Sequence, residues 1–483
     1  MKRNSMIKAI IITFLAYVVL SWIIPGGAFS SGVFTKGSTT PVGIGDIFIY
    51  PISTSITSIF VLTGLIILLI GGLYGVMNKT GVYTKMVSGT AKKFNGKEKT
   101  FLVISILVFA ILSSLTTLTL PLLIIVPFFI AVILTLGFNK MTALLSTVGA
   151  ILVGNMGTIF GYNVGGYSYI NYFFGLKTTE NIAYKIALFV LLVVVLLIFV
   201  IKTSKIDKKE TKKGRKSKKE EETKEELVIP LYKKVEESKK SVVPLVIVLS
   251  VTMVLLLVAM FNWAGAIGVE KTIFDTWYTN ITNVKLNGYS LFANLLGSIN
   301  PFGYWTNYEL AMVLIIAIIL IGAIYNLKVK ETFDAMLDGM KEMLKVAAVV
   351  ILANVLLLVV NSASQTFFTT IFNALFSMSK GLNFVTMSLI SAIGSIAYSD
   401  FPYLMNALYD PVTNLYSSNY AIAVFIMQAI YGFVMLLVPT SFGLVFGLEY
   451  LNISYKEWFK QNWRLLLSLL LTALVVIIVM MLV

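Results

Sequence analysis

The sequence predicts an all-α polytopic membrane protein, and its composition, apolar runs and charge distribution each support this fold class. Apolar residues make up 58% of the 483 positions and charged residues only 13%, whereas a globular domain in water carries roughly a quarter charged residues. A soluble protein of this length would leave too much of that apolar surface in water. We therefore exclude a soluble enzyme and a disordered scaffold.

Charge-free apolar runs of the length that crosses a bilayer, about 20 residues, recur along the whole chain. We expect about nine full spans, at about 9–24, 57–77, 142–165, 186–201, 243–262, 310–327, 346–361, 420–448 and 465–483. Two more apolar stretches, about 101–136 and 381–408, are interrupted by Pro and small polar residues. We expect these two to form re-entrant hairpins instead of simple crossings. No Lys or Arg falls inside an expected span.

The basic residues indicate how the chain is oriented. With these spans, 32 of the 38 Lys and Arg fall on one side, which the positive-inside rule assigns to the cytoplasm. The N-terminus is then inside and the C-terminus outside the cytoplasmic membrane of a bacterium. The first hairpin begins and ends inside, and the second begins and ends outside. Because the net charge of +15 follows from this orientation, we expect a lipid bilayer as partner and no nucleic acid.

A highly charged segment at 202–242 separates an N-terminal half, 1–201, from a C-terminal half, 243–483. Its 15 basic and 9 acidic residues predict a solvated cytoplasmic linker, with binding to anionic lipids as the alternative. Apolar residues at spacings of 3 and 4 in 328–345 predict an amphipathic helix on the membrane surface. The Gly71-Gly72 pair predicts close packing between helices.

Four interruptions of apolar runs, here called the four breaks, are the best pointers to a binding site. They lie at 113–121, 154–163, 398–402 and 439–443. Irregular backbone is tolerated inside a membrane only where protein or a water-filled cavity covers it. Each half shows a break in a hairpin, then a break within the next span, then an intact span. This order predicts inverted repeats, at about 57–201 and 346–483.

Broken helices can bind a carboxylate without a buried cation, because a half-helix N-terminus offers unpaired N–H groups and partial positive charge. Hydroxyl and amide side chains add neutral donors and acceptors. The expected solute site is lined by Ser114, Thr116, Thr117, Asn155 and Thr158 on one side and by Ser399, Asp400, Thr440 and Ser441 on the other. Two alternatives are open: the hydroxyl groups bond to their own helices, or Asp400 caps the second arm of its hairpin.

The chain contains no His and no Cys, which removes most metal-ligand sets and catalytic triads. We therefore expect no enzyme activity, no metal centre and no cofactor. Na⁺ is suited to hydroxyl groups and unwound carbonyls, and a proton is suited to an intramembrane carboxylate. The candidates for coupling to an ion are Thr119, Asn163 and Asp400.

Five short motifs resemble those of one transporter family. They are Trp-Ile-Ile-Pro at 22–25, Gly71-Gly72 with Thr80-Gly81, Leu-Gly-Phe-Asn-Lys-Met-Thr at 136–142, Pro-Thr-Ser at 439–441 and Tyr-Lys-Glu-Trp-Phe-Lys at 455–460. In these the chain resembles the YfcC/DcuC-like family of the ion-transporter superfamily, which is related to divalent-anion/sodium symporters. The resemblance implies secondary transport of dicarboxylates or amino acids, a homodimer, and elevator-like movement of hairpins and broken helices.

The sequence thus predicts a secondary active transporter of a small carboxylate-bearing solute, an amino acid or a C4-dicarboxylate. An ionised Asp400 would repel a dicarboxylate and pair with an amino group, which favours amino acids. An ion channel, whose selectivity also arises at broken helices, is one alternative. The other is a non-transporting receptor or assembly factor, which unbroken helices and a folded soluble domain would favour.

Overall fold

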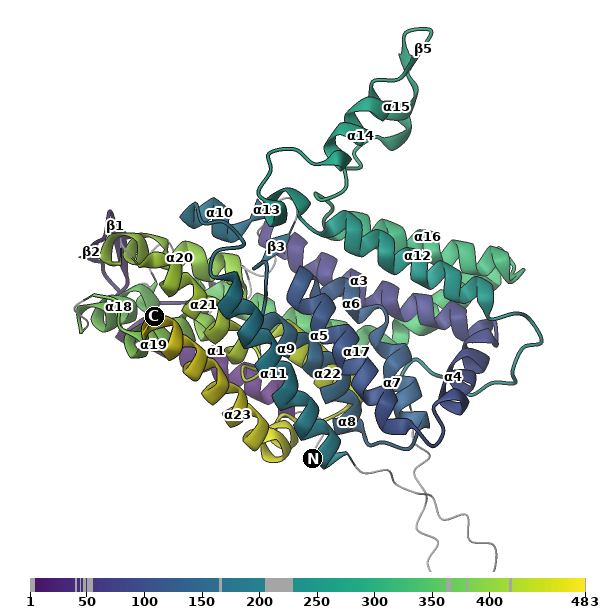
Figure 1. The fold of residues 1–483 in the computed structure, drawn as a ribbon, viewed down its shortest axis with the longest axis horizontal. Helices are drawn as coiled ribbons and strands as arrows, with labels where there is room; N and C mark the ends of the chain where they lie inside the picture. The colour runs from purple at the N-terminus through teal and green to yellow at the C-terminus, as the bar shows by residue number, and fades with distance from the viewer. Residues whose placement is uncertain are drawn as a thin grey trace, which may run out of the picture.

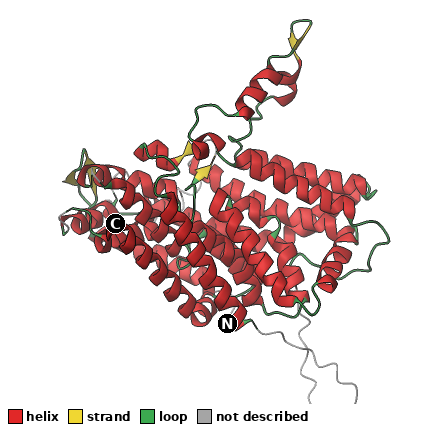
Figure 2. Cartoon of the chain, in the orientation of Figure 1, coloured by secondary structure: helices red, strands yellow, loops and turns green. Residues whose placement is uncertain are grey.

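Helices make up most of the fold (Figure 2). The computed structural model describes residues 5–39, 41–43, 45–46, 49, 55–164, 167–204, 229–361, 366–378, 381–416 and 419–482. Strands occur in these residues only as three two-stranded hairpins, β1–β2, β3–β4 and β5–β6. The predicted all-α class is confirmed.

In the described residues of the N-terminal half, fifteen elements follow the chain from the bottom of Figure 1. They are α1 (Ser5–Ile23), β1 (Gly27–Ser30), β2 (Val33–Lys36), α3 (Ser55–Lys79), α4 (Val82–Lys93), α5 (Glu98–Thr116), α6 (Thr119–Leu123), α7 (Val126–Thr135), α8 (Lys140–Leu144), the π-helical turn η1 (Leu145–Gly149), α9 (Ala150–Met156), β3 (Asn163–Val164), β4 (Tyr167–Ser168), α10 (Tyr169–Phe174) and α11 (Ile182–Thr203).

The C-terminal half begins with a helix, continues into an arm that projects from the bundle (top of Figure 1) and then returns to the bundle. Its elements are α12 (Val243–Met260), α13 (Trp263–Ile267), α14 (Ile273–Thr282), β5 (Lys285–Leu286), β6 (Tyr289–Ser290), α15 (Leu291–Leu296), α16 (Asn307–Ile324), α17 (Val329–Asn361), α18 (Phe367–Ser377), α19 (Phe384–Ala397), α20 (Phe401–Leu415), α21 (Tyr420–Val434), α22 (Phe442–Leu451) and α23 (Tyr455–Leu482).

Seven helices among the described residues are long and apolar enough to cross a membrane, namely α1, α3, α5, α11, α12, α16 and α23. Six of them match predicted spans, and the seventh, α5, was predicted to be the first arm of a hairpin. The other three predicted spans are not single crossings of this kind. The helix predicted at 142–165 ends at Met156, the one at 420–448 is divided into α21 and α22, and 346–361 is the end of α17.

Helix α17 contains the amphipathic helix predicted at 328–345 and extends beyond it. It continues without interruption for 33 residues and packs along α3. A Cβ atom added at Gly71 would lie 2.5 Å from the carbonyl oxygen of Gly339, and one added at Gly72 would lie 2.7 Å from Cγ of Met336. The methionines of the apolar face of 328–345 therefore pack on the glycines of α3, whereas Phe333, Leu337 and Leu344 of the same face stay exposed. The predicted close packing at Gly71-Gly72 is confirmed.

The two halves repeat one order of elements. In each half a long helix, α3 or α17, is followed by a short one, α4 or α18. Next come two arms joined at a break (α5 with α6 and α7, or α19 with α20), a broken helix (α8 and α9, or α21 and α22) and a final long helix, α11 or α23. Equivalent elements pack on each other: α3 on α17, α9 on α21 and α11 on α23. The repeated order is therefore present in the structure, and the inversion of one repeat relative to the other stays a prediction.

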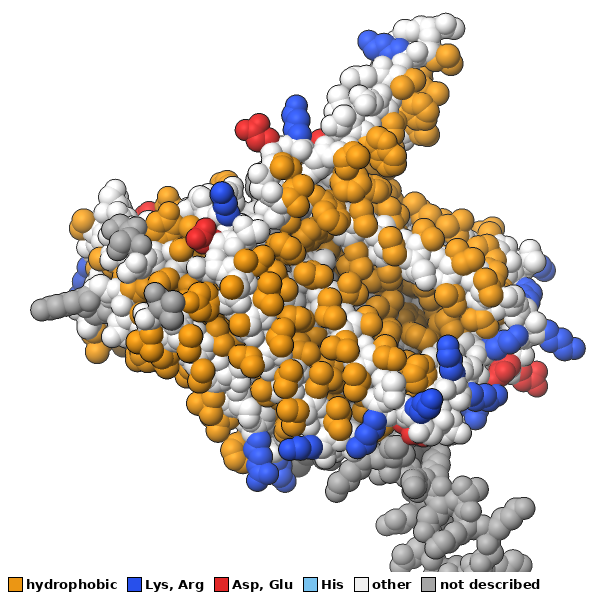
Figure 3. Space-filling model, viewed as in Figure 1, with side chains coloured by type: hydrophobic (Ala, Val, Ile, Leu, Met, Phe, Trp, Pro, Cys, Tyr) orange, Lys and Arg blue, Asp and Glu red, His pale blue; other side chains and the backbone are white. Residues whose placement is uncertain are grey.

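The two ends of the described chain lie at opposite ends of α23. The backbone N–H of Tyr455 donates to Oγ of Ser5 at 3.1 Å, and α23 then runs for 28 residues, roughly 42 Å at 1.5 Å per residue. Apolar side chains cover the middle of the visible face, and Lys and Arg gather along its lower and right edges (Figure 3). The N-terminus lies at the bottom of the bundle and the C-terminus at its left in Figure 1. That the N-terminus is the cytoplasmic one stays a prediction.

The last part of the predicted linker is attached to the bundle. Residues 229–242, here called the strap, cross the ends of α3, α4, α17 and α22. Nδ2 of Asn78 donates to the carbonyl of Leu231 at 3.0 Å, and the hydroxyl of Tyr450 donates to a strap carbonyl at 2.8 Å. This part of the chain is thus not a free solvated linker, because buried groups of both halves bind it. The rest of the linker, 205–228, lies outside the described residues.

Candidate functional site

The first and second breaks are joined by one amide side chain. Oγ of Ser113, in the last turn of α5, donates to Oδ1 of Asn155 at 2.6 Å. Nδ2 of Asn155 donates in turn to Oγ1 of Thr119 at 2.9 Å. Helix α5 ends at Thr116, and Thr117 adopts a left-handed conformation with φ of 55°. Asn155, which is 8% exposed, therefore joins the last turn of α5 to the first residue of α6.

Ser114 and Thr158 join the same two breaks through backbone groups. Oγ of Ser114 donates to the carbonyl of Gly157 at 2.6 Å, and Oγ1 of Thr158 donates to the carbonyl of Ser114 at 3.2 Å. The N–H of Ile159 also donates to the Ser114 carbonyl, at 2.9 Å. These hydroxyl groups satisfy the hydrogen-bonding capacity of backbone carbonyl groups at the breaks, as a membrane interior requires.

The hydroxyl groups of Thr116 and Thr117 bond within their own turn. Oγ1 of Thr116 donates to the carbonyl of Leu112 at 2.6 Å, and Oγ1 of Thr117 donates to the carbonyl of Thr116 at 2.7 Å. This is the local bonding that competes with a ligand role for Ser and Thr in helices. In this conformation both threonines support the end of α5.

The fourth break lies against the first two. Helix α21 ends at Val434, α22 begins at Phe442, and Ser441 holds the N-cap position of α22. A Cβ atom added at Gly443 would lie 3.1 Å from Cδ2 of Leu152 in α9 and 3.7 Å from Cγ2 of Thr119. Three of the four breaks therefore share one region of the bundle.

Thr440 and Ser441 are almost completely buried in the fourth break, at 2% and 1% exposed. Oγ1 of Thr440 has no hydrogen-bond partner among the described residues. A buried hydroxyl group without a partner is uncommon in native structures and needs an explanation. A ligand that accepts or donates a hydrogen bond would supply one.

The third break reaches the second through three aromatic rings, which we call the aromatic cluster. The ring of Phe401, the first residue of α20, stacks on Tyr162 with centroids 4.4 Å apart. Tyr431 of α21 meets both rings edge-on, at 5.4 Å from Tyr162 and 5.0 Å from Phe401. The hydroxyl of Tyr431 also donates to the carbonyl of Ser399 at 2.9 Å. The cluster therefore joins the second hairpin to the broken helices of both halves.

Asp400 occupies the N-cap position of α20. Its carboxylate lies toward the backbone N–H of Tyr403 in the first turn of that helix. Both predicted roles of Asp400, binding of solute or ion and capping of the second arm, stay predictions.

The structure thus brings most predicted site residues together and adds others. Ser113 belongs to the hydroxyl-rich first break, but composition alone did not identify it as the partner of Asn155. The aromatic cluster had no signal in the sequence, because its members come from separate segments of the two halves. Asn163 lies in β3, and its side chain is outside the described part of the chain, so its predicted ion-coupling role stays a prediction.

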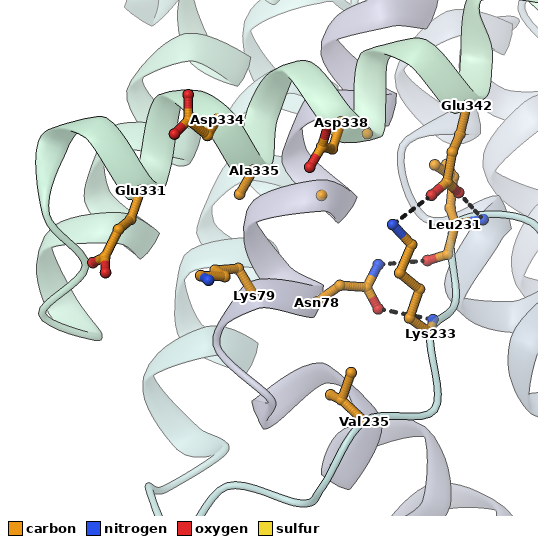
Figure 4. Close-up of a pocket in the computed structure, with 12 residues that line it drawn as sticks. Asn78, Lys79, Leu231, Lys233, Val235, Glu331, Asp334, Ala335, Asp338 and Glu342 are labelled. Atoms are coloured by element: carbon orange, nitrogen blue, oxygen red, sulfur yellow. Dashed lines mark hydrogen bonds and ion pairs between the residues drawn. The ribbon is translucent and has the colours of Figure 1, made fainter.

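The larger of two described cavities lies away from the breaks, where α3 and α17 meet the strap (Figure 4). It has a volume of about 260 Å³ and is lined by both cationic and anionic side chains, including Lys79, Asp334 and Asp338. Beside it, Nζ of Lys233 pairs with Oε1 of Glu342 at 2.9 Å. None of the predicted site residues lines this cavity, and we attribute it to the attachment of the strap.

Among the described residues there is no group of three or more acidic, His or Cys side chains that could hold a metal ion.

Comparison with known proteins identifies a family for this chain. The family model described as DcuC, C4-dicarboxylate anaerobic carrier, matches residues 4–482, which is nearly the whole chain. No curated protein matches the chain.

Proposed function

Since the chain belongs to the DcuC family of C4-dicarboxylate anaerobic carriers, we propose that it is a secondary active transporter of C4-dicarboxylates in the cytoplasmic membrane. The proposal rests mainly on one observation: the first, second and fourth breaks lie together in one region of an apolar helical bundle. Broken helices at the middle of inverted repeats are typical of the solute sites of secondary transporters. The sequence alone favoured an amino acid as the solute. Because the family is described as one of C4-dicarboxylate carriers, we propose a dicarboxylate instead.

We propose that the solute binds between the first, second and fourth breaks. The buried hydroxyl of Thr440 has no partner among the described residues, and Ser441 precedes the ten residues of α22. The N–H groups in the first turn of such a helix favour a carboxylate. Asn155 would control the distance between the breaks through its hydrogen bonds to Ser113 and Thr119.

The negative charge of Asp400 is better suited to a coupling cation than to a dianion. We propose Na⁺ as this ion, with a proton as the alternative, because an opposite charge at Asp400 would remove its repulsion of the solute. Thr119 and Asn163 are the further proposed ion-coupling residues. Coupling of this kind would make solute uptake depend on the ion gradient.

For the movement, we propose that α3 and α17 form a fixed frame, in which glycines allow the two backbones to approach closely. The hairpins and broken helices would move against this frame as an elevator, within a homodimer. The breaks suit the moving part, because their polar contacts are mostly with one another.

Uptake into proteoliposomes tests the proposed function. Purified protein is reconstituted, and uptake of radiolabelled succinate, fumarate and serine is measured with and without a Na⁺ gradient and a pH gradient. We expect saturable succinate uptake that fumarate inhibits and serine does not, increased by an inward Na⁺ gradient. Flux without saturation would indicate a channel, and absence of flux with intact protein would indicate a receptor or assembly factor.

A further inference from the structure

One buried cation is not used by the site described so far. Lys185 is 4% exposed, and it is the only buried Lys among the residues that the structure describes. The sequence places it just before a span predicted at 186–201, but α11 begins at Ile182, so Lys185 lies in its first turn. A cation there opposes the helix dipole, and ionisable residues buried in membrane proteins are commonly functional.

Lys185 faces the segment that follows the second break. One turn further along α11, Phe189 packs against this break, since a Cβ atom added at Gly157 would lie 2.7 Å from Cα of Phe189. Residues four apart share a face of a helix. Nζ of Lys185 donates to the carbonyl of Thr178 at 2.9 Å, which holds the ammonium group on this face.

A small cavity separates Lys185 from Gln428 of α21. Its volume is about 10 Å³, enough for roughly one water-sized group. Gln428 is 3% exposed, and its Nε2 has no hydrogen-bond partner among the described residues. A Cβ atom added at Gly161 would lie 2.8 Å from this Nε2, so the amide also borders the second break. The exposed Glu180 lines the cavity as well.

The cavity therefore brings a buried cation next to a buried donor that has no partner. The donor is Nε2 of Gln428, and the ammonium group of Lys185 is bonded to the Thr178 carbonyl and lies near the carboxylate of the exposed Glu180. Buried donors without partners require an acceptor, and an ammonium group binds an anionic oxygen more strongly than a neutral one. A carboxylate oxygen has the size and charge that this position accepts.

We propose that Lys185 and Gln428 bind one carboxylate group of the C4-dicarboxylate beside the second break, as the solute passes between the breaks and the outer side. Lys185 lies in the first turn of α11, whereas Lys202 lies in the last turn, at the end of the helix that leads into the charged linker. This inference rests on the proposed function. It adds a fixed positive charge on the path of a dianion, which the breaks themselves do not provide.

Kinetics of succinate uptake with matched variants test this proposal. Lys185→Met removes the buried ammonium group, and Lys177→Met removes an exposed one from the preceding loop. We expect Lys185→Met to raise KM for succinate about tenfold or more, with a smaller change in kcat, and Lys177→Met to leave KM unchanged. Gln428→Glu keeps the shape but places a carboxylate beside Lys185, and we expect it to raise KM as well.

The outcomes separate this inference from the proposed function. If wild-type protein takes up succinate and both Lys185→Met and Gln428→Glu keep the wild-type KM, the carboxylate site is refuted and the transporter stands. If wild-type protein takes up no dicarboxylate, the proposed function itself fails. Should Lys185→Met not assemble, as judged by size-exclusion chromatography, the isosteric Gln428→Glu decides alone: a raised KM supports the site and an unchanged KM overturns it.

Discussion

Asn155→Ala is the substitution that most directly perturbs the junction of the first two breaks. It removes the acceptor of the 2.6 Å hydrogen bond from Ser113 and the donor of the 2.9 Å hydrogen bond to Thr119. The hydroxyl of Ser113 also reaches the carbonyl of Ile151 at 2.6 Å, so it keeps an acceptor in the variant. Since the single hydroxyl proton of Ser113 has either acceptor available, the variant loses the bond to Thr119 and one of the two acceptors of Ser113, without a new unpaired donor.

The magnitude follows from those two bonds. A net contribution of about 0.5–1.5 kcal/mol each is typical in proteins, and about 0.6 kcal/mol is the average between membrane helices. Together they amount to about 1–2 kcal/mol. If the junction must form in the transport cycle, kcat/KM for the solute falls by roughly 5- to 30-fold, at 1.36 kcal/mol for each factor of ten.

Succinate uptake into proteoliposomes measures this loss, with Ser113→Ala and the double variant as controls. Because both single changes remove the Ser113–Asn155 bond, we expect the double variant to be less impaired than the sum of the two, as in a double-mutant cycle. An Asn155→Ala protein that assembles normally and keeps kcat/KM within about twofold of wild type would refute the role of Asn155.

Two more predictions concern packing and the second hairpin. A methyl group at Gly339 would overlap the Gly71 carbonyl and lie 2.8 Å from a backbone nitrogen, so we expect Gly339→Ala to lower stability by about 3 kcal/mol or more and to lower the thermal midpoint in detergent. Gly89→Ala, where an added Cβ meets nothing within 4 Å, is the control and should leave that midpoint equal or higher. Tyr431→Phe keeps the aromatic cluster but removes the 2.9 Å bond to Ser399; we expect a loss of about 1 kcal/mol, seen as a several-fold lower uptake rate, and a rate equal to wild type would contradict this role for the hydroxyl.

The positions of the breaks could be predicted from the sequence because helix interruption is a local property. Pro and small polar residues inside an apolar run disfavour a continuous helix. Helix α5 accordingly ends at Thr116, and α22 begins at Phe442, directly after the Pro-Thr-Ser motif. The repeated order of elements could be predicted for the same reason, since it depends on the sequence of breaks and spans and not on contacts between them.

The partners of each element could not be predicted, because a periodic pattern shows which face is apolar and not what covers it. The spacing of Met336 and Met343 indicated an amphipathic helix, which we predicted to lie on the membrane surface. These methionines pack instead on α3, whose glycines leave room for their side chains. In the same way, the hydroxyl groups of the first break indicated polar contacts, but which of them bonds to Asn155 depends on how α5 lies on α9.

The chemistry of one residue was also insufficient to choose the solute. Asp400 favoured an amino acid when only its charge was considered. The family instead supports a dicarboxylate, which is why we propose Asp400 for a coupling ion and not for the solute. Lys185 was overlooked because the predicted span began one residue after it, whereas the helix includes it.

The central claim is that C4-dicarboxylates bind where the breaks meet, and protection of a single cysteine tests it most directly. The chain contains no Cys, so Thr440→Cys introduces one thiol at the buried break, and Thr35→Cys introduces one in the exposed β1–β2 hairpin as a control. The measurement is the rate of modification by a small thiol reagent with and without succinate. We predict that succinate slows modification of Thr440→Cys and not of Thr35→Cys, while serine slows neither. Equal rates at Thr440→Cys with and without succinate, in protein that still takes up succinate, would contradict the claim.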